Sequence, residues 1–417
     1  MNSDRLSDWL GYINSKRPNE KEFGLERLKG VYSELIKKPI AAKTILIAGT
    51  NGKGSTAEFL KNFLFSAGFT VGVYTSPHLI HFNERIRINE NQICDEKIVS
   101  SFKKIEDCKG KTKLTYFDYA TLAAFDIFSE AQLDFAILEI GIGGKYDPVN
   151  LLDSDISIIT NIDLDHEKWL GRTLNDIGFQ KAAILKEGRV GILGNANMPD
   201  SVNIRASEVC SKKFQLGEDY IIEKNMKDWG YRLLDYDFQL ENIPFSNLNN
   251  ESIASAVTAF KILTDRDVNF HQIIEKTFLK GRCDSIENFI LDASHNPASV
   301  RNLITFLSEN HKSKKFKAIF SCVSEKDFSS MIRDISPLIS EWIVCEMHDI
   351  RFNTDDLVNA ISESINGKVT IADSVYSAVE REYHEGNDCL VFGSFITVSQ
   401  AYKALNQLKN KPEDENY

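Results

Sequence analysis

A glycine-rich segment, Gly49–Ser55 (GTNGKGS), lies directly between an apolar run and a stretch with helical periodicity. The apolar run, Lys43–Ala48 (KTILIA), is typical of a buried strand. In the stretch that follows the glycines, the i, i+3, i+4, i+7 spacing places four apolar residues on one helical face: Leu60, Phe63, Leu64 and Ala67. A strand, a glycine loop and a helix in this order predict the first unit of an α/β domain.

The composition of this loop predicts a phosphate site. Glycines let backbone N–H groups turn inward as a concave anion site, the helix N-terminus adds partial positive charge, and Lys53 adds a full one. Ser55 supplies a hydroxyl for phosphate or metal. The spacing departs from the usual P-loop, because Ile47 stands where a glycine is expected and Gly54 separates the lysine from the serine. The alternative is a glycine-rich turn with a solvated lysine.

Further apolar runs predict two α/β domains. Phe135–Ile140 and Ile156–Ile162 read as parallel strands buried on both faces. A second set of strands alternates with helical stretches such as Ala298–Ser308; its members are Phe289–Leu291, Lys317–Val323, Trp342–Cys345 and Cys389–Phe395. We therefore expect a P-loop-containing, doubly wound parallel-sheet ATPase domain at residues 1–283 and a smaller Rossmann-like α/β domain at residues 284–417. Residues 195–250 are polar and are expected to be irregular.

Composition limits the classes of partner. Lys+Arg 49 against Asp+Glu 60 leaves a net charge of −11, which disfavours a general nucleic-acid binder. No apolar run approaches the roughly 18 residues that a membrane helix needs. The first residues lack the apolar core of a signal peptide, so a cytoplasmic protein is expected. The seven cysteines never form C-x-x-C, which supports neither a disulfide scaffold nor a thiolate zinc site.

Acidic residues that follow two of the strands are candidate metal ligands. Glu139 closes an apolar strand, where a carboxylate is costly unless it meets a cation at the carboxyl edge of the sheet. The alternative is an acid that emerges into solvent. Asp163, Asp165 and His166 follow the next strand in the same way. Histidine is an uncommon Mg²⁺ ligand, so a hydrogen-bonded loop histidine stays open for His166.

Lys181 occupies an unusual position. It shares one predicted helical face with apolar residues only: Leu174, Ile177, Ile184 and Leu185. A buried lysine can lose its charge through a lowered pKa, and the neutral amine can take up CO₂ to form a carbamate, an oxygen-bearing metal ligand. The alternative is that the side chain extends to the surface.

Several segments, taken together and in order, resemble the folate branch of the Mur ligase superfamily. The resemblance runs from Phe23–Leu28 (FGLERL) to about residue 400. Besides Gly49–Ser55, the matching segments are Tyr74–Asn89 (YTSPHLIHFNERIRIN), Thr115–Phe125 (TYFDYATLAAF), Leu138–Asn150 (LEIGIGGKYDPVN), Thr160–Gly171 (TNIDLDHEKWLG), Gly281-Arg282, Leu291–Pro297 (LDASHNP) and Gly393–Thr397 (GSFIT).

The resemblance implies ATP-dependent ligation of L-glutamate to dihydropteroate and to the γ-carboxyl of reduced folates, through an acyl phosphate. It implies ATP and one or two Mg²⁺ ions as cofactors, K⁺ as an optional further ion, small-molecule partners and a monomer. Three alternatives stay open: a folylpolyglutamate synthase alone, another Mur-type amino-acid ligase, and a module that only senses ATP. The stretch Tyr74–Asn89 argues against the second, because it is similar to the folate branch specifically.

The resemblance also implies residue roles. The ATP-binding residues would be Thr50, Asn51, Gly52, Lys53, Gly54, Ser55, Ser252, Arg282 and Asp292. The metal ligands would be Ser76, Glu139, His166 and Lys181 as a carbamate. The pterin-binding residues would be Lys21, Glu22, Phe23, Gly24, Thr115, Tyr116, Phe117, Asp118, Tyr146, Asp147 and Pro148. The catalytic residues would be Lys53, His166, Lys181 and His295, with a purely structural hydrogen-bonding role as the alternative for His295.

Four departures from the family pattern bear on these roles. In the second domain, Asp292–His295 reads Asp-Ala-Ser-His where Asp-Gly-Ala-His is commoner. Gln180 stands where the family usually has glutamate before its carbamylated lysine. Pro148 interrupts the Asp-Ala-Thr-Asn pattern, and Ser252 falls where an adenine-contacting asparagine is usual, with Asn249 and Asn250 nearby. They affect adenine recognition and the pterin loop rather than the reaction class.

Overall fold

The fold was analysed in a computed structural model that describes residues 3–15, 24–364 and 368–410. The chain forms two compact units, Met1–Thr277 and Phe278–Tyr417, whereas the sequence places the boundary after residue 283. Three of the residues predicted to bind the pterin, Lys21, Glu22 and Phe23, lie outside the described residues. In the described part of the chain, no helix is long and apolar enough to cross a membrane.

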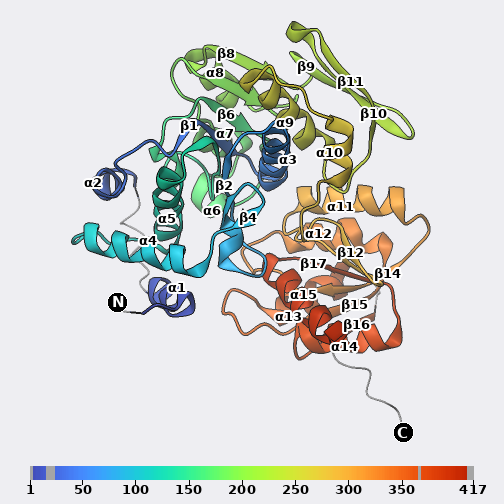
Figure 1. Ribbon diagram of the computed structural model, residues 1–417. Coiled ribbons are helices and arrows are strands. Elements are labelled where there is room, and N and C mark those ends of the chain that lie inside the picture. The colour runs from blue at the N-terminus through green and yellow to red at the C-terminus, as the bar shows by residue number, and fades with distance from the viewer. Residues whose placement is uncertain (1–2, 16–23, 365–367, 411–417) are drawn as a thin grey trace. The chain divides into compact units, whose positions relative to one another are not determined.

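Unit 1 is built on a mostly parallel sheet (Figure 1). In spatial order its described strands are β4 (Asn91–Gln92), β3 (Ile86–Ile88), β2 (Val71–Tyr74), β5 (Leu133–Glu139), β1 (Ala41–Ala48), β6 (Ile156–Ile159), β7 (Val190–Leu193) and β8 (Lys212–Gln215). Among the described strands of this sheet, the antiparallel pairs are β2 with β3 and β3 with β4. The register sets Glu139 beside Ile47 of the central strand, so the carboxyl ends of β1 and β5 meet at one edge.

Helices cover both faces of this sheet. Their bounds are α1 (Leu6–Ser15), α2 (Glu26–Leu35), α3 (Lys53–Ser66), α4 (Asp95–Cys108), α5 (Tyr116–Glu130), α6 (Glu167–Leu170), α7 (Leu174–Ala182), α8 (Asp200–Val209), α9 (Asn250–Leu263) and α10 (Phe270–Lys276). On one face Phe63 of α3 packs against Phe260 and Phe270, with ring centroids 6.1 and 5.0 Å away. On the other, α1, α4 and α5 share a continuous apolar core with the sheet.

The expectation that residues 195–250 are irregular is wrong. They contain α8, β8 and a separate antiparallel sheet of β9 (Tyr220–Lys224), β10 (Asp228–Leu233) and β11 (Phe238–Pro244), which stands apart from the main sheet in Figure 1. Along β10, Trp229, Tyr231 and Leu233 are buried while the residues between them are more exposed. Because polar residues or glycine alternate with these apolar ones, β10 gives no continuous apolar run in the sequence.

Unit 2 has a second sheet, in the order β12 (Asp284–Ile286), β13 (Phe289–Leu291), β17 (Cys389–Phe392), β14 (Phe316–Phe320), β15 (Ile339–Cys345) and β16 (Lys368–Ala372). Of the strands that the structure describes in this sheet, only β12 is antiparallel to its neighbour. The helices are α11 (Pro297–Asn310), α12 (Phe328–Ile335), α13 (Thr354–Ser364), α14 (Val375–Glu385) and α15 (Phe395–Asn410). The two-sheet α/β architecture confirms the predicted fold class.

Several predicted strands end earlier than expected; the one predicted over Lys317–Val323, for example, ends at Phe320. The strand predicted to reach Phe395 ends at Phe392, because Gly393 has a φ of 111° and turns the chain. Ser394 Oγ then accepts a hydrogen bond from Thr397 N at 3.0 Å in the first turn of α15. The strand predicted to reach Ile162 ends at Ile159, where the chain turns toward the glycine loop.

Candidate active site

Two glycines set the path of the loop between β1 and α3. Gly49 has a φ of 149°, and a Cβ there would lie 1.8 Å from Thr160 Oγ1. Gly52 has a φ of 82° and caps α3, and a Cβ there would lie 2.7 Å from Ser252 Oγ. L-residues rarely adopt these conformations, and the space beside both positions is already filled. The loop therefore requires glycine at 49 and 52.

Hydrogen bonds from neighbouring segments hold the loop. Thr50 N donates to Asn161 O at 2.9 Å, and Asn51 N donates to Asn161 Oδ1 at 2.9 Å. Thr160 Oγ1 donates to Asn51 O at 2.6 Å. Ser252 Oγ donates to Gly52 O at 3.3 Å, so the hydroxyl at this predicted nucleotide-binding position contacts the loop itself. Sequence reasoning assigned no role to Asn161, although it lies within the matching segment Thr160–Gly171.

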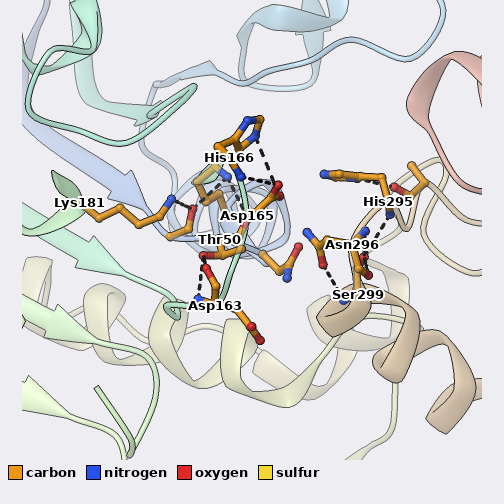
Figure 2. Close-up of polar contacts among 12 residues, drawn as sticks. Thr50, Asp163, Asp165, His166, Lys181, His295, Asn296 and Ser299 are labelled. Carbon is orange, nitrogen blue, oxygen red and sulfur yellow. Dashed lines mark hydrogen bonds and ion pairs between the residues drawn. The ribbon is translucent and has the colours of Figure 1, made fainter. Parts of the chain in front are cut away.

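Two lysines converge on one carbonyl of this loop. Lys53 Nζ donates to Gly49 O and to Thr50 O, both at 3.2 Å. Lys181 is buried, and its Nζ donates to Gly49 O at 2.7 Å. Figure 2 shows Lys181 reaching the loop at Thr50. The prediction that Lys181 faces inward is correct, and the alternative that it extends to the surface is wrong.

The helical face predicted around Lys181 needs one correction. Leu174 is the first residue of α7 and is exposed, because the helix begins at the surface. Ile184 and Leu185 are buried as expected, but they follow the end of the helix at Ala182.

Glu139 faces the cation of the loop. Its side chain is buried, its Oε1 lies 4.0 Å from Lys53 Nζ, and its Oε2 accepts a hydrogen bond from Ser76 N at 3.1 Å. The alternative that this acid emerges into solvent is therefore wrong. Ser55, in the first turn of α3, is also buried.

His166 and its neighbours form the other side of the loop. His166 has a left-handed backbone with a φ of 53° and precedes α6. Its Nε2 lies 4.0 Å from Asp165 Oδ2 (Figure 2). Asp163 N donates to Thr50 Oγ1 at 2.9 Å, which ties this segment to the loop. These contacts explain why a histidine is held in a conformation that is uncommon outside glycine.

Within the described ranges, no group of three or more His, Cys, Asp or Glu side chains is arranged to hold a metal ion. Mg²⁺ typically uses one or two carboxylates together with substrate phosphates and water. The buried carboxylate of Glu139, next to a loop built for phosphate, is a donor set that fits this mode of binding. The residues present therefore fit a Mg²⁺ ion that is held jointly by the protein and by the phosphates of a bound nucleotide.

Two of the acids predicted to bind the pterin, Asp118 and Asp147, already have protein partners. Asp118 caps α5, where it accepts hydrogen bonds from Thr115 N at 2.6 Å and from Arg27 at 2.7 Å. Asp147 accepts three backbone hydrogen bonds, from Gly141 N, Ile142 N and Val149 N. Burial raises the pKa of Asp147 to about 7, although these N–H donors act in the opposite direction.

The other predicted pterin-binding residues that the structure describes differ in their surroundings. A Cβ on Gly141 would lie 2.6 Å from Phe117 Cζ, so this loop packs closely on α5. Tyr146 is exposed, whereas Pro148 is buried. Gly24 lies just before α2. Tyr116 is partly buried, and the guanidinium of Arg85 lies 5.6 Å from its ring centroid.

Unit 2 places Arg282 and His295 against one aromatic ring. The guanidinium of Arg282 lies 5.0 Å from the centroid of Phe395, and the ring of His295 lies 5.7 Å from the same centroid. His295 Nδ1 is 2.8 Å from Ala293 O, which favours the tautomer that donates from Nδ1. Sequence analysis did not assign Phe395 a role, although it lies within the matching segment Gly393–Thr397.

Asp292 is buried and organises its own loop. It accepts hydrogen bonds from Cys283 N at 2.8 Å and from Ser294 N at 2.9 Å. Asn296 then caps α11 by accepting from Ser299 N at 2.9 Å, as Figure 2 shows beside His295. If Asp292 contacts nucleotide, it does so with a carboxylate that also accepts these backbone hydrogen bonds from its own loop.

Comparison with known proteins shows the family to which this chain belongs. Residues 47–257 match the Mur ligase middle domain, and residues 280–395 match the Mur ligase glutamate ligase domain. A dihydrofolate synthase/folylpolyglutamate synthase of Haemophilus influenzae is 31% identical, over 96% of this chain and 97% of its own. The structure of Escherichia coli FolC in complex with DHPP and ADP has a TM-score of 0.91 and 29% identity, covering 98% of this chain and 99% of that one.

A second solved structure, of a bifunctional folylpolyglutamate synthase/dihydrofolate synthase with Mn, AMPPNP and L-glutamate bound, has a TM-score of 0.86 at 31% identity. It covers 97% of this chain and 98% of its own. The chain belongs to the Mur ligase family. These matches extend over nearly the whole chain at about the same identity. Within the family, they place it with the bifunctional dihydrofolate synthase/folylpolyglutamate synthases.

Proposed function

We propose that this chain uses ATP to join L-glutamate to dihydropteroate and to the γ-carboxyl of reduced folates. The carboxylate of the acid substrate attacks the γ-phosphorus of ATP, which gives an acyl phosphate and releases ADP. The amine of glutamate then attacks the acyl carbon, phosphate leaves, and the amine loses its proton. The observation that carries this proposal is the convergence of Lys53, Lys181 and Glu139 on one glycine loop, in a chain related over its length to such ligases.

The loop would hold the phosphates. Its inward N–H groups and the ammonium of Lys53 stabilise the charge that develops on the transferred phosphoryl group, because phosphoryl transfer depends mainly on positioning and electrostatics. Glu139, Ser76 and His166 would hold one or two Mg²⁺ ions, whose chemistry when bound is to neutralise phosphate charge. The position of Glu139 supports this role, because its carboxylate is buried beside Lys53 at the glycine loop.

The same proposal covers the finer roles. Lys181 would act as a carbamate, formed when its neutral amine adds CO₂ and releases a proton, and K⁺ would be a further ion of the site. In unit 2, Arg282 and Asp292 would contact nucleotide, and His295 would orient phosphate. Phe395 supports these roles, because it holds the side chains of Arg282 and His295 on one ring. We propose a monomer.

Phosphate release from ATP tests the proposal directly. The purified protein is supplied with Mg²⁺, L-glutamate and either dihydropteroate or tetrahydrofolate, and the products are identified by mass. Glutamylated product from both acids is expected. Product from tetrahydrofolate alone would reduce the function to that of a folylpolyglutamate synthase. No product with either acid from folded protein would refute the proposal.

The Lys53→Ala variant should lose at least about 10³-fold in kcat, because the cation that meets the transferred phosphoryl group is removed. The control is Lys97→Ala, which removes an exposed lysine of α4 and should leave kcat unchanged. Circular dichroism checks that both variants fold. Near-normal turnover by Lys53→Ala would contradict the role given to this lysine.

A further inference from the structure

In the described part of unit 1, one buried cation, Arg85, forms no ion pair with an acid. Arg85 ends the 3-10 turn Phe82–Arg85, and only 8% of its surface is exposed. Among the residues that the structure describes, no carboxylate lies within ion-pair distance of its guanidinium. The adjacent acid, Glu84, is already engaged, since its carboxylate accepts backbone hydrogen bonds from Leu79, Ile80 and His81.

Three rings fix the guanidinium in place. Arg85 Nε donates to Nδ1 of His78 at 2.8 Å. The guanidinium carbon lies 5.7 Å from the ring centroid of Phe82 and 5.6 Å from that of Tyr116. Because Nδ1 of His78 accepts this bond, its ring is neutral and supplies no negative charge. The group is therefore held rigidly without being neutralised.

A buried charge without a partner is costly, so its persistence points to a ligand of opposite sign. The planar guanidinium binds carboxylate in a bidentate manner, and stacking between rings leaves its edge available for this. Arg85 also lies close to the proposed chemistry. Its carbonyl accepts a hydrogen bond from Thr75 N at 3.0 Å, and the next residue, Ser76, donates to Glu139.

We propose that Arg85, positioned by His78, binds the α-carboxylate of the terminal glutamate of the folate substrate. This inference rests on the proposed function. That carboxylate does not react, so it keeps its charge at every step and can stay paired. The reacting carboxylate, by contrast, loses its charge on becoming an acyl phosphate, which would leave the buried guanidinium unpaired again. Dihydropteroate has only the reacting carboxylate, so Arg85 distinguishes the two acid substrates.

Dihydropteroate and dihydrofolate form a matched pair of probes, because they differ only by the glutamyl group. Their dissociation constants are measured by titration calorimetry for the wild type and for Arg85→Gln. The substitution should weaken the binding of dihydrofolate by roughly 10- to 100-fold, the loss expected for a charge-assisted hydrogen-bonded pair, and should leave the binding of dihydropteroate unchanged. Arg85→Lys keeps the positive charge but lacks the two parallel N–H donors of the guanidinium. It should weaken the binding of dihydrofolate less than Arg85→Gln does and should also leave the binding of dihydropteroate unchanged.

Arg87→Gln is the matched control. Arg87 lies two residues further on but is paired with Glu58 at 2.6 Å, so its loss should lower stability and leave the ratio of the two dissociation constants unchanged. An equal loss for both probes in Arg85→Gln or Arg85→Lys would overturn the proposal. So would a selective rise in the KM for L-glutamate or for ATP. If the wild type bound neither acid, the proposed function itself would fail.

Discussion

Lys181 shows how neighbours set the chemistry of one residue. Its ammonium and that of Lys53 both donate to Gly49 O, so two like charges lie close together, and the one at Lys181 is buried. Burial and a nearby like charge both favour the neutral amine over the ammonium. The neutral amine is the form that adds CO₂. A carbamate at this position would replace a positive group by a negative one, next to the proposed metal ligands.

The carbamate is tested by ¹³C NMR on protein equilibrated with ¹³C-labelled bicarbonate. We expect a carbamate signal in the wild type, because Lys181 is buried and burial disfavours the charged form of a lysine. The signal should disappear in Lys181→Ala together with most of the turnover. Lys97→Ala serves as the comparison, since it removes an exposed lysine of α4 and should keep the signal. An unlabelled wild type with full activity would rule the carbamate out.

At the scale of elements, the glycine loop depends on packing against β6. A Cβ at position 49 has no room because of Thr160 Oγ1, and the left-handed φ adds strain. The loop, its strand and its helix were all predictable, because apolar periodicity and glycine spacing are local signals. The sheet β9–β11 was not, because its short strands mix apolar with polar residues and form an apolar face only once they pair.

The Gly49→Ala variant should lose roughly 1–3 kcal/mol or more of unfolding free energy, from overpacking against Thr160 and backbone strain. Nucleotide binding should weaken with it. Gly30→Ala is the control, because Gly30 lies inside α2 with open space around it and alanine is the better helix former. Urea denaturation measures both. Equal stability of the two variants would show that the loop can move away from Thr160.

At the scale of the whole molecule, the sequence predicts both α/β domains, and the family resemblance orders their motifs. The parallel pairing of β1 with β5 brings Glu139 and the glycine loop to one edge of the sheet. This juxtaposition follows from the predicted α/β fold, because ligands bind at the carboxyl ends of its strands. The contacts of Arg85 with His78 and of Phe395 with Arg282 were not predictable. They join turns whose paths depend on the completed fold, and no periodicity marks them.

Nucleotide should stabilise the folded chain by linkage, since the site exists only when strands and helices are assembled. With Mg²⁺ and a non-hydrolysable ATP analogue at 100 times its dissociation constant, the gain should be about 2.7 kcal/mol, which appears as a higher thermal midpoint. Lys53→Ala should show a much smaller shift at the same concentrations. A chain that melts at the same temperature with and without saturating analogue would contradict a preformed nucleotide site.

The hydrogen bonds that Asn161, Thr160 and Ser252 make to the glycine loop have a consequence for affinity. They give the loop its ligand-ready shape during folding, so little conformational entropy remains to be lost when nucleotide arrives. Substitutions of Asn161, Thr160 or Ser252 would act through the shape of the loop and not through a contact with ATP. They would chiefly lower the association rate of nucleotide and raise its dissociation rate. Adaptation of this enzyme to low ATP concentrations can therefore proceed through residues outside the loop sequence.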